Sequence, residues 1–359
     1  MHETPVPDLT PAAVLRGPAD VIAALPHLLG FVPQESLIAV WVRDGAVALT
    51  QRIDLPGCGG EDAVAAHLLR TAAHAQAGEV IVVIASAEPH PPLGLPFAAL
   101  VDAVASGAEE AGLQVLDALL TDGARFWSYR CEDGCCPTQG RAVEAVAHDR
   151  MAAAFAAPAP DRGRAALKAD WAPDERASAA LEPLIEDWES DRDADIDRAE
   201  RLAARAALEA WRDAQITAIE AALASGESPG RAELARLLVG LSDVRVRDTI
   251  VWERAQGDAT EPMRTRLAEA LRAAPAGYVA PVATVLALTC WQMGDGARAV
   301  MALERALDDD PEYRLARLVA ESVGSGIPPR EWREMVRGMS RAQCRMPADP
   351  DSPGSAESV

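Results

Sequence analysis

Three cysteines in the segment SYRCEDGCCPTQG are the strongest candidates for chemistry in this sequence. Cys131, Cys135 and Cys136 lie within six residues of one another. Thiolates bind zinc or iron–sulfur clusters, and a close pair of thiols can exchange with a disulfide. The spacing is not C-x-x-C, and two adjacent cysteines do not easily face one tetrahedral metal ion. Three interpretations stay open: structural thiols in a tight turn, ligands of a metal such as zinc, or a redox pair.

A second set of polar residues suggests a site for a small ligand. Arg52 and Asp54 are separated by one residue on a predicted strand, so both side chains point to one face, and we expect them near Ser36 or Asp20. The pair could hold a substrate carboxylate, but a structural ion pair is favoured because no base or nucleophile is evident beside it. The candidate ligand-binding residues are Asp20, Ser36, Arg52, Asp54, Arg125 and Tyr129.

An α/β domain over residues 16–156 is expected to position both sets, after a flexible N-terminus at 1–15. The sequence predicts a first helix from Pro18 to Gly30, a buried strand over 37–42, and a second strand that starts at Val47. Asp44-Gly45 favours a tight hairpin between these strands. Helices then alternate with strands at 80–85, 113–120 and 126–131, which indicates a mixed sheet with helices packed on it. No strand is predicted after Gly140.

The rest of the chain is expected to be helical. A linker with short helices is predicted over 157–192, an all-helical domain over 193–338, and a disordered tail over 339–359. One long alanine-rich helix is expected from Asp193 to Ala224. A pattern of leucine, alanine and proline recurs after 36 residues, with Gly-Asp at 257–258 and again at 294–295, which favours tandem, tetratricopeptide-like helical hairpins. The residues expected to contact a partner segment are Trp291, Arg298 and Arg305.

The composition argues against two classes of partner. The formal net charge is −21, and a field of that sign repels nucleic-acid phosphates and anionic membranes. No stretch has the 18 or more apolar residues typical of a membrane span, and six cysteines are too sparse for a disulfide framework. We therefore expect a soluble cytoplasmic protein that binds neither nucleic acid nor membranes. The sequence gives no expectation for the oligomeric state.

Four stretches together resemble the actinobacterial family known as domain of unknown function 4192. They are RGPADVIAALPHLLGFVPQESLIAV, QRIDLP, RFWSYRCEDGCCPTQG and LALTCWQMGDGARAVMALERALDDDPEYRLARL, in this order from Arg16 to about Trp332. The resemblance implies an actinobacterial source and no established activity, so it transfers no role to any residue.

Three functions are consistent with these observations. The leading hypothesis is a non-catalytic interaction or scaffold protein, in which the helical hairpins bind another protein and the α/β half is a rigid platform. The first alternative is a metal- or redox-dependent enzyme or sensor built on Cys131, Cys135 and Cys136. The second is binding of a small anion or nucleotide by the α/β domain.

Overall fold

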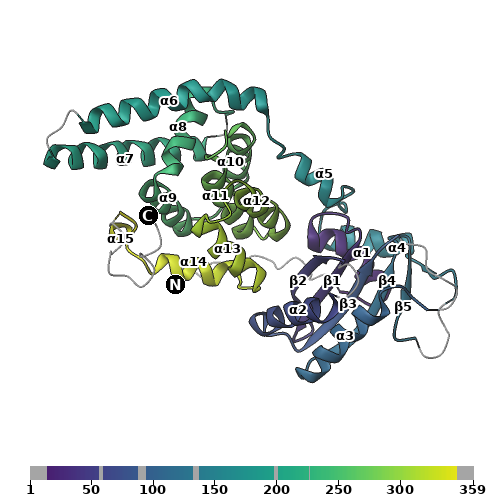
Figure 1. Ribbon diagram of the computed structural model, residues 1–359. Coiled ribbons are helices and arrows are strands. Elements are labelled where there is room, and N and C mark those ends of the chain that lie inside the picture. Colours follow the sequence, from purple (N-terminus) through teal and green to yellow (C-terminus); the bar gives the residue numbers. More distant parts are fainter. Residues whose placement is uncertain are drawn as a thin grey trace, which may run out of the picture. The chain divides into compact units, whose positions relative to one another are not determined.

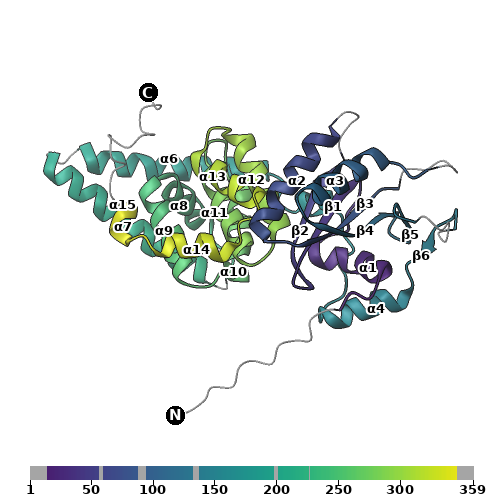
Figure 2. The same cartoon turned by 90° about the horizontal axis from the view of Figure 1, so that it is seen from below.

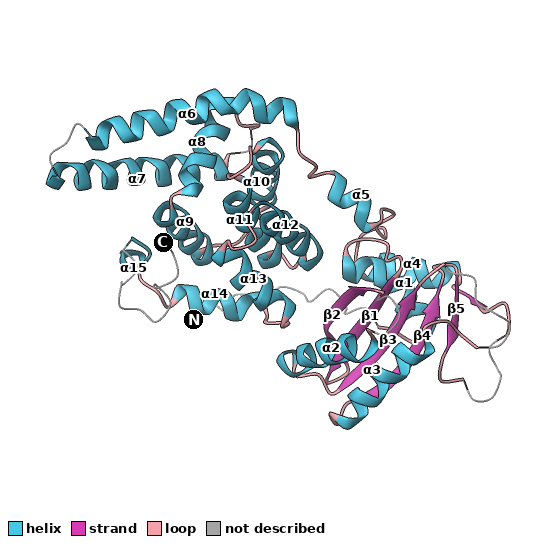
Figure 3. Ribbon diagram, in the orientation of Figure 1, coloured by secondary structure: helices cyan, strands magenta, loops and turns pink. Residues whose placement is uncertain are grey.

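A computed structural model describes residues 14–55, 60–87, 94–131, 137–197, 201–225 and 227–345. The chain divides into two compact units, one of Met1–Leu167 with Gly324–Ile327 and one of Lys168–Val323 with Pro328–Val359. Among the described residues, all strands belong to the first unit (Figures 1 and 3). The predicted order, a mixed sheet with helices followed by a helical region, is confirmed.

Six strands form one mixed sheet in the order β2-β1-β3-β4-β5-β6. Among the described strands, β3 and β4 are parallel and the other neighbouring pairs are antiparallel. The strands are β1 (Ser36–Arg43), β2 (Ala46–Asp54), β3 (Glu79–Ala85), β4 (Gln114–Thr121), β5 (Arg125–Ser128) and β6 (Arg141–Ala142). β6 corrects the expectation of no strand after Gly140, because two residues are too few to show an alternating pattern.

The hairpin between β1 and β2 forms at the predicted dipeptide. Asp44 and Gly45 have φ angles of 53° and 76°, and two positive φ angles in a two-residue turn match the twist of the strands that it joins. Arg43 pairs with Ala46 directly beyond the turn, which fixes the register of the hairpin.

Helices cover both faces of the sheet (Figure 2). On one face lie α2 (Glu61–Ala75) and α3 (Ala98–Glu110), and on the other lie α1 (Pro18–Leu29) and α4 (Ala145–Ala154). β1 is buried from Ser36 to Val42, and β3 is buried from Val80 to Ala85. Central strands that are covered on both faces read as continuous apolar runs, which is why these two strands were predictable.

The second unit is a stack of helices that follows the short α5 (Arg164–Ala169). The helices of this unit are α6 (Glu175–Asp197), α7 (Arg201–Ala224), α8 (Arg231–Ser242), α9 (Val244–Gln256), α10 (Glu261–Ala273), α11 (Val279–Gln292), α12 (Gly296–Asp309), α13 (Arg314–Gly324), α14 (Pro329–Arg337) and α15 (Arg341–Arg345). α11 is buried on every side from Val279 to Trp291, as its almost wholly apolar sequence requires.

The predicted hairpins are found in part. α11 packs extensively on α12, and the small residues Ala287, Ala299 and Ala306 are fully buried on these two helices. α9 instead packs on α7, α8, α14 and α15, while α10 packs on α11. The recurring Gly-Asp therefore marks turns between successive helices, but only the second turn joins a closely packed pair.

Two expectations at helix ends are corrected. The helix expected from Asp193 to Ala224 is divided between α6 and α7, which run side by side (Figure 1). The residues between them, 198–200, lie outside the described residues, and the sequence has no glycine or proline there to mark a break. Within the expected tail, Arg341–Arg345 forms α15, where Arg341 Nε lies 2.7 Å from Glu253 Oε1 and Cys344 is buried. The remainder of the expected tail, 346–359, and residues 1–13 lie outside the described residues.

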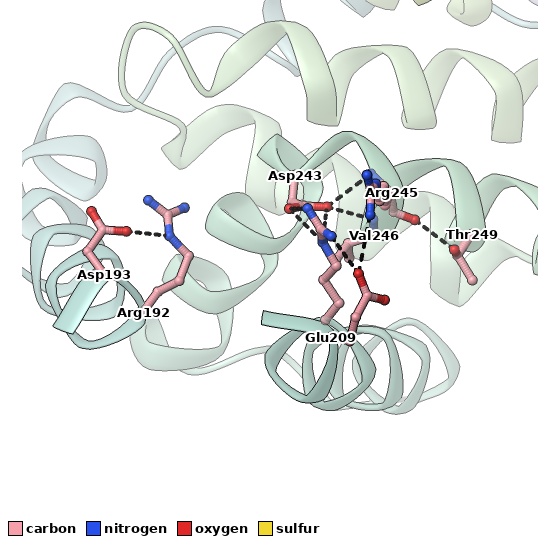
Figure 4. A network of polar contacts seen from close by, with 8 residues as sticks. Arg192, Asp193, Glu209, Asp243, Arg245, Val246 and Thr249 are labelled. Atoms are coloured by element: carbon pink, nitrogen blue, oxygen red, sulfur yellow. Dashed lines mark hydrogen bonds and ion pairs between the residues drawn. The ribbon is translucent and has the colours of Figure 1, made fainter. Parts of the chain in front are cut away.

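A network of charged groups connects α7 to the junction of α8 and α9 (Figure 4). Asp243 caps α9 by accepting hydrogen bonds from the backbone N–H groups of Arg245 and Val246. Its carboxylate also accepts two hydrogen bonds from Arg212, from Nε at 3.0 Å and from Nη2 at 2.9 Å. Glu209 Oε1 accepts from both Arg212 and Arg245, at 2.8 and 3.2 Å. The Asp243 carboxylate thus caps α9 and also binds Arg212 on α7.

Replacing this carboxylate should destabilise the second unit. Asp243→Ala removes the cap of α9 and leaves the mostly buried Arg212 without its bidentate partner, so we expect the free energy of unfolding to fall by about 2 kcal/mol. Urea unfolding followed by circular dichroism measures this change. Asp187→Ala, at an exposed position of α6, is the matched control and should change stability by less than about 0.5 kcal/mol. Equal effects of the two substitutions would contradict the role of the network.

Candidate functional site at the carboxyl edge of the sheet

Most of the polar residues that were predicted to bind a ligand lie at one end of the strands, which we call the carboxyl edge of the sheet. β1 is antiparallel to both β2 and β3, and β3 is parallel to β4, so the carboxyl ends of β2, β3 and β4 meet there. β1 and β5 begin at the same edge. In open α/β sheets, ligands collect outside the carboxyl ends of the strands.

Arg52, Asp54 and Ser36 form a connected group at this edge, as predicted. Arg52 Nε donates a hydrogen bond of 2.7 Å to Ser36 Oγ, and Ser36 Oγ donates one of 2.6 Å to the carbonyl of Gln34. Arg52 Nη2 lies 2.5 Å from Asp54 Oδ1, and the side chain of Asp54 is 76% exposed. Arg52 is thus engaged on several sides, which favours the structural ion pair over a free anion anchor.

Sequence reasoning missed Glu35, which joins three strand ends. Its carboxylate accepts hydrogen bonds from Ser86 Oγ at 2.8 Å and from the backbone N–H of Ala87 at 3.0 Å, just after β3. Its carbonyl accepts from the N–H of Leu55, just after β2, at 3.2 Å. Glu35 holds a φ of 41°, a region that a residue with a side chain seldom occupies, and these bonds stabilise it there. An acidic residue directly before a buried strand was the available signal.

Asp20 lies apart from this group, between α1 and α4. It is almost completely buried, and its carboxylate accepts hydrogen bonds from Arg150 Nη2 and, at 3.0 Å, from the backbone N–H of Arg16. Burial alone would raise the pKa of Asp20, but the hydrogen bonds and the positive charge of Arg150 outweigh it and hold the pKa below its ordinary value. The expectation that Asp20 lies with Arg52 is therefore corrected, because its partner is Arg150, which is distant in sequence.

Side chains of β5 and Tyr129 bond to backbone carbonyls on both sides of the segment that carries the three cysteines, which we call the thiol segment. Arg125 Nη1 donates to the carbonyls of Gln139 and Gly140, at 3.0 and 3.3 Å, and Trp127 Nε1 donates to that of Thr138 at 3.2 Å. Tyr129 donates from its hydroxyl to the carbonyl of Pro96 at 2.6 Å, and burial raises its pKa, so the phenol keeps its proton. Arg125 and Tyr129 thus bind backbone carbonyls, and their assignment as ligand-binding residues stays a prediction.

The predicted thiol cluster can be followed only at its first member. Cys131 is half-buried three residues after β5, whereas Cys135 and Cys136 lie outside the described residues. In the described part of the chain, no three or more histidine, cysteine, aspartate or glutamate side chains are grouped to hold a metal ion. The zinc and redox interpretations therefore stay predictions. Cys290 is a packed thiol, as its neighbours suggested: it is fully buried, and burial raises its pKa to about 12.

The three residues predicted to contact a partner are engaged within the second unit. Trp291 is 5% exposed, and its ring centroid lies 6.0 Å from that of Trp332. Arg298 Nη1 lies 2.6 Å from Asp295, which caps α12, and Arg305 donates to the carbonyl of Trp171. Trp291 is thus buried on α11, whereas Arg298 and Arg305 of α12 are half-buried, and contact of the three residues with a partner stays a prediction.

The chain belongs to the family described as domain of unknown function (DUF4192), whose family model matches residues 18–330. A search of curated proteins found no match, and a search of solved structures found none either. Within the described residues, no helix has the length and apolar character needed to cross a membrane.

The buried ion pair of Asp20 gives a pH-dependent prediction. A carboxyl whose pKa is lowered by folding stabilises the folded state above its ordinary pKa of about 4, and this contribution is lost as the pH falls through the lowered value. Asp20→Asn should therefore reduce the free energy of unfolding by about 2 to 3 kcal/mol at pH 7, and the difference from wild type should shrink below pH 4. Urea unfolding at several pH values measures it. Asp54→Asn, in an exposed pair, should cost less than about 0.5 kcal/mol at pH 7.

Substitution of two glycines tests whether Trp127 packs on the turn at Gly140, which follows the thiol segment. Gly140 and Gly123 both have positive φ, 72° and 94°, so alanine at either position carries a backbone strain of about 1 kcal/mol. A Cβ at Gly140 would also lie 2.5 Å from the Trp127 ring, whereas one at Gly123 meets nothing within 4 Å. Gly140→Ala should therefore lower stability by a further 1 to 3 kcal/mol or so. Equal melting temperatures of the two variants would show that Trp127 does not pack on this turn.

Proposed function

We propose that this chain is a protein-interaction protein, in which the helical unit binds a partner protein and the α/β unit serves as a rigid platform. The observation that carries the proposal is a set of large apolar side chains exposed on and after the last amphipathic helices. Leu318 on α13 is 55% exposed, Met335 on α14 is 62% exposed, and Met339 is 45% exposed. A partner protein could bury these side chains, and the flexible thioether of methionine adapts to a partner surface.

The arrangement of the helices supports this proposal. α11 and α12 form a closely packed pair with small buried residues, as in a tetratricopeptide-like hairpin. Stacked helical pairs bury their inner faces against their neighbours and leave outer faces for partners. The charged network around Asp243 joins α9 to α7, and α14 packs on α9, so this packing helps to preorganise the surface of α14.

The other two functions expected from the sequence have less support. A metal- or redox-dependent enzyme or sensor needs Cys135 and Cys136, which lie outside the described residues. Binding of a small anion or nucleotide would compete with existing contacts, since Arg52 donates to Ser36 and pairs with Asp54, and Arg125 Nη1 donates to backbone carbonyls. An interaction role requires neither.

The test is partner capture by the full-length protein with the exposed apolar side chains replaced. Leu318→Glu combined with Met335→Glu should reduce the amount of partner captured from an extract of the source organism by at least about tenfold, because each charge would be buried in the complex. Quantitative mass spectrometry of the captured proteins measures it. Leu116→Glu, at a 41% exposed position of β4, is the matched control and should leave capture unchanged. Undiminished capture by the double variant, with an unchanged circular dichroism spectrum, would remove this surface from the proposal.

A further inference from the structure

Within the described parts of the chain, the sheet ends on one side at β2, a nine-residue strand whose one neighbour is β1. The register shows which of its backbone groups point outward. Leu55 N–H bonds to the Glu35 carbonyl, and this pair continues the register of Ser36 with Asp54. Since inward and outward residues alternate in an antiparallel ladder, Gln51 and Ile53 also face β1. Thr50 and Arg52 therefore turn their N–H and C=O groups away from the sheet.

These outward groups have no backbone partner among the described residues. Thr50 and Arg52 are half-buried, and Ala46, Val47 and Ala48 are exposed. An edge with a row of unpaired N–H and C=O groups is a template for a further strand.

We propose that β2 pairs antiparallel with β2 of a second copy of this chain, so that two sheets join into one continuous sheet across a twofold axis. The outward residues must form the hydrogen-bonded pairs of the new ladder. A twofold axis at Thr50 satisfies this condition, since Thr50 then exchanges both backbone hydrogen bonds with Thr50 of the second copy. Arg52 lies opposite Ala48 of the second copy, and Leu49 lies opposite Gln51.

The residues of this register suit a second copy of the same strand. No charge faces a like charge, and the small side chain of Ala48 leaves room for the long side chain of Arg52. An axis at Arg52 would instead bring two guanidinium groups together. At Thr50, two threonines face each other, which is a favourable pair across antiparallel strands.

Two features oppose association and limit its extent. A register shift between Trp41 and Val42 bends β2 near Ala48, so the new ladder spans the residues from Ala48 to Arg52. The formal charge of −21 on each chain also disfavours a dimer. Added salt screens this repulsion, so the dimer should strengthen as the salt concentration rises.

Sedimentation equilibrium of the full-length protein tests the proposal. The wild type should form a dimer. Thr50→Pro removes the central outward N–H, which an edge strand tolerates, and should weaken dimerisation about tenfold or more because two symmetry-related bonds are lost. Thr50→Val keeps the backbone N–H and should remain dimeric. Circular dichroism checks that the proline variant is folded.

Cysteine cross-linking tests the register independently of the proline variant. Hydrogen-bonded partners across strands have Cα atoms about 5.5 Å apart, which a disulfide can span. Thr50→Cys should therefore give a covalent dimer on mild oxidation. Ala48→Cys is the matched control: its two copies would lie about 14 Å apart along the strands and should give no more cross-linked dimer than the wild type.

Three results would overturn the proposal. The first is a wild-type protein that stays monomeric at its highest soluble concentration in high salt. The second is a dimer that folded Thr50→Pro does not weaken. The third is an oxidised Thr50→Cys sample with no more covalent dimer than Ala48→Cys, which would place any association on another surface.

Discussion

The complete burial of the central strands is the constraint on which the rest of the first unit depends. β1 and β3 are apolar and covered on both faces, so polar side chains can be accommodated only at strand ends and on outer strands. This is why Glu35, Ser36, Arg52 and Asp54 lie at strand ends. Arg52 bonds there to Ser36 and Asp54, and Glu35 accepts from Ser86. The same constraint leaves one long strand with an open side, since β1 lies along only one side of β2.

The second unit buries its apolar residues between helices and places its polar groups around them. α11 supplies a wholly buried centre, and the surrounding helices are fixed by arginine–carboxylate contacts such as those of Asp243 and Asp295. Each of these aspartates caps a helix and also binds an arginine, so backbone and side-chain bonding are satisfied together. The apolar side chains that stay exposed on α13 and α14 lie outside this packing, and they are the ones that the proposed partner would bury.

The sequence predicts what local patterns determine. Asp44-Gly45 predicts the hairpin, the run from Val80 to Ala85 predicts a covered strand, and the alternation at Arg52 and Asp54 predicts their ion pair. It does not predict contacts between distant segments, such as Asp20 with Arg150, because no local pattern encodes them. Trp291, in contrast, could have been placed correctly, since a helix that is apolar on all sides is buried.

Residue-resolved amide hydrogen exchange of the full-length protein, at low and high concentration, tests most directly whether the open side of β2 pairs with a second copy. The amides of Gln51 and Ile53 should be protected at both concentrations, because they bond to β1. Those of Thr50 and Arg52 should exchange fast in dilute protein and slowly in concentrated protein. Rapid exchange of Thr50 and Arg52 at every concentration would contradict pairing between two copies, and rapid exchange of Gln51 and Ile53 would contradict the strand order itself.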